Sequence, residues 1–123
     1  MKIDILISTA LILAFSVSLS MADTNQRTRD YHNAMKKLEK KTVRALSSCH
    51  EEAGCVDNEY SRFVQKRNKL VKSKLKITLT HFERVTKKTL KKESTCVRSS
   101  PTEAQGCFEA SDAKTEKMVA ALS

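Results

Sequence analysis

The chain of 123 residues contains no tryptophan, only two glycines and a single proline, and 5% of its residues are aromatic. Glycine and proline are the residues that most often interrupt helices and form turns, so their scarcity favours long helices and few loops. The scarcity of aromatic side chains predicts a thin core made mainly of aliphatic residues. A chain of this length suggests one domain, for which such a core is only just sufficient.

Motifs of the common enzyme classes are also missing. The sequence has no G-x-S-x-G, no H-E-x-x-H and no glycine-rich phosphate loop. The acidic pair Glu51 and Glu52 lies in a short segment between two cysteines and is better explained as a solvent-exposed turn. A zinc site on Cys49 and His50 lacks the usual cysteine and histidine spacing. We therefore expect no enzymatic activity, no cofactor and no metal site.

The N-terminal segment has the pattern of a secretory signal peptide. Lys2 is followed by an apolar stretch from Ile5 to Leu19, and the small residues Ser20 and Ala22 fit cleavage after Ala22. The stretch is shorter than the roughly 18–20 residues that a transmembrane helix needs, which disfavours an uncleaved anchor. No later segment is apolar enough to span a membrane. We predict a signal peptide over residues 1–22 and a single secreted domain over residues 23–123.

Four cysteines follow this segment in two close pairs, Cys49 with Cys55 and Cys96 with Cys107. An even number of cysteines behind a signal peptide predicts disulfide bonds, because secreted proteins fold in an oxidising compartment. Between the pairs, residues 56–95 contain no glycine, proline or cysteine.

The spacing of apolar residues predicts three helices. The first covers roughly residues 24–50, and the second follows Asp57 as its N-cap and extends over about residues 57–97. Ser100, Pro101 and Glu103 then provide an N-cap serine, a proline at the first helical position and a capping box for the third helix. The expected fold is therefore all-α, with three antiparallel helices and a long central one.

A continuous central helix also decides the disulfide pairing. It would be about 60 Å long and would hold Cys55 and Cys96 at opposite ends, whereas a disulfide needs Cα atoms within about 7 Å. The expected bonds are therefore Cys49–Cys55 and Cys96–Cys107, each closing one helix junction. The alternative is a break near residues 77–81, where β-branched residues lower helix propensity. The chain would then form a four-helix up-down bundle, and cross-pairing would become possible.

The apolar residues of the central helix occupy an arc of roughly 220°, wider than a one-sided helix needs. Leu75, Ile77, Leu79 and Phe82 crowd its middle. Overlap of the two flanking helices explains the arc, and a homodimer interface or a cavity for a small apolar ligand are the alternatives.

The formal net charge is +9, and much of it lies on the predicted central helix. Seven basic side chains project from the side opposite its apolar arc: Arg62, Lys66, Lys69, Lys76, Arg84, Lys87 and Lys91. A second basic run on the first helix comprises Lys36, Lys37, Lys40, Lys41 and Arg44. These side chains form either an anion-binding ridge or a solvated face that keeps the protein soluble. No nucleic-acid-binding module is visible, so sequence-specific nucleic-acid recognition is not expected.

In its signal peptide, its Cys49-x5-Cys55 and Cys96-x10-Cys107 pairs and its lysine-rich helices, the chain resembles the small helical four-cysteine secreted proteins of insect saliva, seminal fluid and gut lumen. This resemblance in architecture implies a role in binding host, mate or microbial molecules, and it transfers no functional residue.

Our first functional hypothesis is a secreted basic binding protein that engages an anionic partner, such as a glycosaminoglycan, an acidic protein or an anionic surface. The alternatives are a carrier of a small apolar ligand and an antimicrobial or membrane-active protein.

Overall fold

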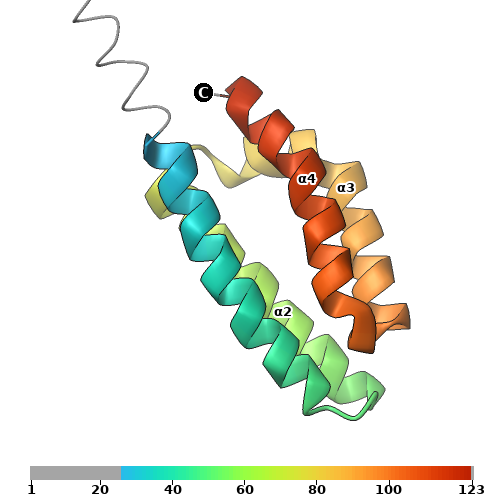
Figure 1. Ribbon diagram of the computed structural model, residues 1–123. Helices are drawn as coiled ribbons and strands as arrows, with labels where there is room; N and C mark the ends of the chain where they lie inside the picture. The colour runs from blue at the N-terminus through green and yellow to red at the C-terminus, as the bar shows by residue number, and fades with distance from the viewer. Residues whose placement is uncertain (1–25, 123) are drawn as a thin grey trace, which may run out of the picture.

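The computed structural model describes residues 26–122 and confirms an all-α helical bundle in this range (Figure 1). Its elements are a first helix over residues 26–47, α2 (Ala53–Leu70), a π-helical turn (Val71–Leu75), α3 (Leu79–Ser99), a 3-10 turn (Pro101–Glu103) and α4 (Ala104–Leu122). The predicted signal peptide over residues 1–22, with its cleavage after Ala22, lies outside the described residues.

The helices are arranged as two hairpins (Figure 1). The first helix lies beside α2, α3 lies beside α4, and the chain crosses from α2 to α3 at the end of the bundle opposite the cysteine-containing turns. Within the described part of the chain, none of the helices is long and apolar enough to cross a lipid bilayer.

The predicted continuous helix over residues 57–97 is interrupted, and the four-helix alternative is the one observed. The backbone of Lys76 turns into the left-handed region with φ 57°, and its N–H donates to the carbonyl oxygen of Val71 at 3.0 Å. Two residues later, the hydroxyl of Thr78 accepts a hydrogen bond from the N–H of His81 and caps α3. Threonine is more favourable as the N-cap of a helix than inside a helix. The β-branched segment therefore ends one helix and begins the next.

The break also explains the wide apolar arc. Val71 and Leu75 in the π-helical turn that follows α2 are buried, and so is Phe82 in the first turn of α3. Because α2 and α3 are separate antiparallel helices, each turns its own apolar face towards the bundle axis. The arc is therefore the sum of two ordinary helix faces.

Both predicted disulfides are present, Cys49–Cys55 with a Cα separation of 5.5 Å and Cys96–Cys107 with 5.8 Å. The pairing is as predicted, but the continuous helix from which it was derived is absent, and the two bonds lie at the same end of the bundle rather than at opposite ends. Each bond joins the two sides of its own short junction, so the local geometry of each turn selects the pairing.

The two cysteine-containing junctions differ from the predicted caps. Helix α2 begins at Ala53 rather than after Asp57, and the carboxylate of Glu52 caps it by accepting hydrogen bonds from the N–H groups of Gly54 and Cys55 at 2.9 and 2.7 Å. A Cβ on Gly54 would come within 2.9 Å of that carboxylate, so only glycine fits this cap without a shift. Before α4, Pro101 starts a 3-10 turn as a first-position proline, but the Ser100 side chain makes no capping hydrogen bond.

Phenylalanine side chains contribute more to the core than expected, because the composition predicted a mainly aliphatic core. Phe63, Phe82 and Phe108 are each 1% exposed, and the rings of Phe63 and Phe108 lie 4.6 Å apart between α2 and α4. An aromatic contact of this kind adds to the burial of apolar area and joins the two hairpins.

Candidate functional site

The seven basic residues predicted to form one ridge are all exposed, but they lie on two helices and the turn between them. Arg62, Lys66 and Lys69 belong to α2, Lys76 lies in the turn, and Arg84, Lys87 and Lys91 belong to α3. Lys66 and Lys69 line a groove shared with the first helix, whereas the three residues of α3 line a shallow hollow on α3 itself. The break at Lys76 therefore divides the set into two surfaces.

The groove between the first helix and α2 brings basic residues from both sequence runs together. Lys37 and Lys41 stand on the first helix, and Lys66 and Lys69 stand on α2. Between them lie the aliphatic side chains of Ala34, Leu38 and Leu70, and the groove has a volume of about 370 Å³. We call this feature the lysine groove. Sequence reasoning placed Lys37 and Lys41 in a separate run, because only antiparallel packing of the two helices makes the four lysines neighbours.

Within the described part of the chain, none of the four lysines forms an ion pair. The nearest acidic residue in the sequence of the first helix, Glu39, is turned into the bundle and is 8% exposed. On α2, the carboxylate of Glu59 is engaged by Arg62 at 3.2 Å. Ammonium groups without carboxylate partners create a positive potential at the groove, which attracts anions and weakens as salt rises.

A second set of charges lies inside the bundle. The guanidinium of Arg67 donates to the carboxylate of Glu93 at 2.7 Å, and the hydroxyl of Tyr60 donates to the same oxygen at 2.8 Å. Arg67 and Glu93 are 4% and 3% exposed. Burial alone would lower the pKa of Arg67, but the adjacent Glu93 carboxylate outweighs that effect and raises it, so the guanidinium stays charged. Arg67 also lies over the ring of Phe63, at 5.0 Å from its centroid.

Sequence reasoning missed this buried ion pair, although a signal was present. Arg67 follows Tyr60 and Phe63 on the buried face of α2, and Glu93 follows Phe82 at helical spacing on the buried face of α3. A charged residue in register with apolar core positions on each of two neighbouring helices is the pattern of a buried pair.

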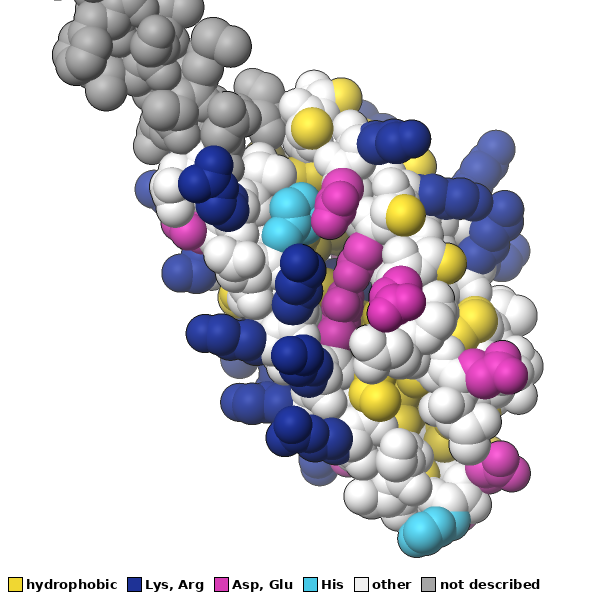
Figure 2. All heavy atoms as spheres, in the orientation of Figure 1, with side chains coloured by type: hydrophobic (Ala, Val, Ile, Leu, Met, Phe, Trp, Pro, Cys, Tyr) yellow, Lys and Arg dark blue, Asp and Glu magenta, His cyan; other side chains and the backbone are white. Residues whose placement is uncertain are grey.

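Two carboxyl groups meet at the seam between the first helix and α4. Burial, a hydrogen bond with Asp112 and the charge of Asp112 raise the pKa of Glu39 from 4.5 to about 9. Burial raises the pKa of Asp112 as well. The raised pKa favours the protonated form of the Glu39 carboxyl near neutral pH. Figure 2 shows acidic side chains gathered along this seam, next to a row of lysine and arginine side chains on the first helix. At the same seam His32 lies 3.9 Å from Glu116.

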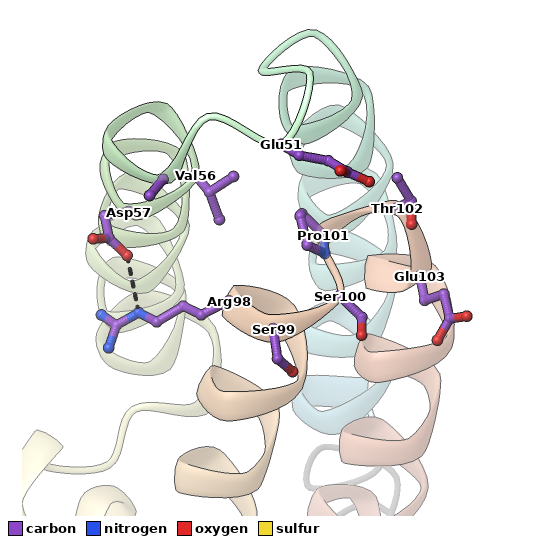
Figure 3. A pocket seen from close by; sticks show the side chains of 10 residues that line it. Glu51, Val56, Asp57, Arg98, Ser99, Ser100, Pro101, Thr102 and Glu103 are labelled. Carbon is purple, nitrogen blue, oxygen red and sulfur yellow. Dashed lines mark ion pairs between the residues drawn. The ribbon is translucent and has the colours of Figure 1, made fainter.

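Another hollow, of about 500 Å³, lies at the disulfide end between the start of α2 and the turn after α3 (Figure 3). Its cation, Arg98, is engaged by Asp57 at 3.2 Å and lies over the ring of Tyr60. Glu51 and Glu103 stand on its exposed edges. Because Asp57 already pairs with the guanidinium of Arg98, this hollow offers an anion no free positive charge.

Metal ligation has no support in residues 26–122, where no three histidine, cysteine, aspartate or glutamate side chains are placed to hold an ion. Cys49, considered above with His50 as a zinc ligand, is bonded to Cys55.

No family model, no curated protein sequence and no solved structure matches this chain. The residues and their geometry are therefore the basis for inferring function.

Proposed function

We propose that this chain is a secreted binding protein that engages an anionic partner, and that the lysine groove is the binding site. The observation that carries the proposal is the convergence of four exposed lysines from two helices on one groove, with no carboxylate paired to any of them within the described residues. A solvated face that serves only solubility would need no such convergence.

Two further features support a secreted role. The N-terminal sequence pattern is that of a signal peptide. The two disulfides fit an extracellular protein, because such bonds persist in oxidising compartments.

Chromatography on immobilised heparin tests the proposal. We expect the protein to elute at higher salt than a control protein of equal net charge, and the variant Lys37→Gln/Lys66→Gln to elute earlier. The matched control is Lys87→Gln/Lys91→Gln, which removes the same charge from α3. Equal elution of both variants would mean that net charge alone drives binding and would refute the groove as the site.

The packing of the apolar residues bears on the two alternative hypotheses. In the apolar arc that suggested a ligand cavity, Leu75 and Phe82 are buried in the core, and Ile77 and Leu79 are partly buried against it. The apolar faces of α2 and α3, which suggested membrane activity, are directed to the same core. Binding of a fluorescent lipid probe would support the carrier alternative, and leakage of anionic vesicles would support the membrane-active alternative.

A further inference from the structure

The lysine groove combines two chemistries that a partner must satisfy together. Its floor consists of Ala34, Leu38 and Leu70, of which Ala34 and Leu70 are partly buried and Leu38 belongs to the core. Its rim consists of the four lysines. A partner can therefore make apolar and ionic contacts in the same groove.

The spacing of the lysines limits the size of the ligand. Lys37 and Lys41 are four residues apart on the first helix, and Lys66 and Lys69 are three apart on α2. Residues at these separations are neighbours on one helix face, about 5–6 Å apart. Packed helices lie about 8–10 Å apart. The four ammonium groups therefore surround a floor that is only about one helical turn long, with long aliphatic stems that can lean over it.

Three common kinds of anionic ligand each match only part of this groove. A fatty acid has a single carboxylate and would leave most of the cations uncompensated. A sulfated glycan supplies many negative charges but no apolar group for the floor. A phospholipid surface holds its acyl chains beneath its headgroups and presents no single apolar group to a groove between two helices.

We propose that the lysine groove binds an acidic segment of a protein partner in which one large apolar side chain is flanked by carboxylates. The apolar side chain lies on Leu38 and Leu70, and the carboxylates pair with lysines on both walls. Carboxylates three or four residues from the apolar residue on a helix would match the spacing of the lysines. The inference rests on the proposed function and narrows its partner from any anion to an acidic peptide.

The test uses two fluorescently labelled synthetic peptides of identical charge, each with glutamates on both sides of one central residue. The central residue is leucine in one peptide and serine in the other. Binding to the intact protein is followed by fluorescence anisotropy. We expect the leucine peptide to bind about tenfold or more tightly than the serine peptide, because only leucine places apolar surface on the floor. Lys66→Gln/Lys69→Gln should weaken both peptides, whereas Lys87→Gln/Lys91→Gln should weaken neither.

A heparin oligosaccharide, tested in parallel, distinguishes failure of this inference from failure of the proposed function. Groove-dependent heparin binding with equal affinity for the two peptides would overturn the inference and leave the proposed function intact. If neither peptide nor heparin binds in a groove-dependent way, both are overturned. Because the four lysines are exposed, their replacement by glutamine should preserve the fold, and circular dichroism checks this.

Discussion

Two neighbouring residues of α2 carry positive charge in opposite environments. Arg67 is 4% exposed and is bound by Glu93, whereas Lys66 is exposed and lies on the rim of the lysine groove. The helix repeat turns one side chain towards the bundle axis and the other towards the seam with the first helix. Position on the helix, and not charge, therefore separates a structural cation from one that is available to a partner.

The largest expected effect is the loss of one member of the buried pair. Arg67→Ala or Glu93→Ala should lower the free energy of unfolding by about 3–5 kcal/mol, because each leaves an uncompensated charge in the core. Urea denaturation measures this loss. Lys66→Ala, the matched exposed substitution, should change stability by no more than about 0.5 kcal/mol. Equal losses of unfolding free energy for Arg67→Ala and Lys66→Ala would contradict the structural role assigned to Arg67.

The pH dependence of stability should be set by Glu39, which lies at the seam between the first helix and α4. Because the folded-state pKa of Glu39 is raised from 4.5 to about 9, the folded protein holds a proton that the unfolded chain releases. The contribution of the protonated Glu39 to the free energy of unfolding is complete below pH 4.5 and is lost as the pH rises towards 9. The decline should reach at most about 1.4 kcal/mol per pH unit. Thermal unfolding across this range should show a flatter profile for Glu39→Gln, and an unchanged profile would contradict the assignment.

The two disulfides should differ slightly in what they contribute. They span sequence separations of 6 and 11 residues, and loop-closure entropy gives about 2.2 and about 2.8 kcal/mol respectively. Replacing both cysteines of a pair by serine and measuring urea denaturation tests this. A greater loss from Cys49→Ser/Cys55→Ser than from Cys96→Ser/Cys107→Ser would show that the shorter bond acts by more than chain entropy, for instance through the Glu52 cap.

The smallest effect on stability is expected in the lysine groove itself. Lys66→Gln/Lys69→Gln should leave the free energy of unfolding within about 1 kcal/mol of the original, because exposed charges contribute little to stability. Urea denaturation measures this change. A large loss would mean that these lysines support the fold.

Much of the fold could be predicted from the sequence, since helical periodicity and cysteine spacing are local signals. The all-α class followed from them, whereas the correct disulfide pairing had been derived from a continuous central helix that the structure does not contain. The choice between one long helix and two depended on Lys76 and Thr78, where left-handed backbone and a threonine cap compete with continued helix. Helix propensity is a weak signal that tertiary packing routinely overrides, so the sequence left both outcomes open.

The candidate site was harder to predict for the same reason. Lys66 and Lys69 were recognised as basic, but their neighbours Lys37 and Lys41 come from a helix that is distant in the sequence. The pairing of Glu39 with Asp112 likewise joins two helices far apart in the chain. Periodicity indicates which face of a helix is buried, but it does not say which helix lies opposite.

Backbone amide chemical shifts, recorded while a heparin oligosaccharide is added, show directly whether the lysine groove is the binding site. We expect the perturbed amides to cluster at residues 34–41 and 66–70, on the two walls of the lysine groove. Perturbations centred on residues 84–91 of α3, or spread evenly over all exposed lysines, would contradict it.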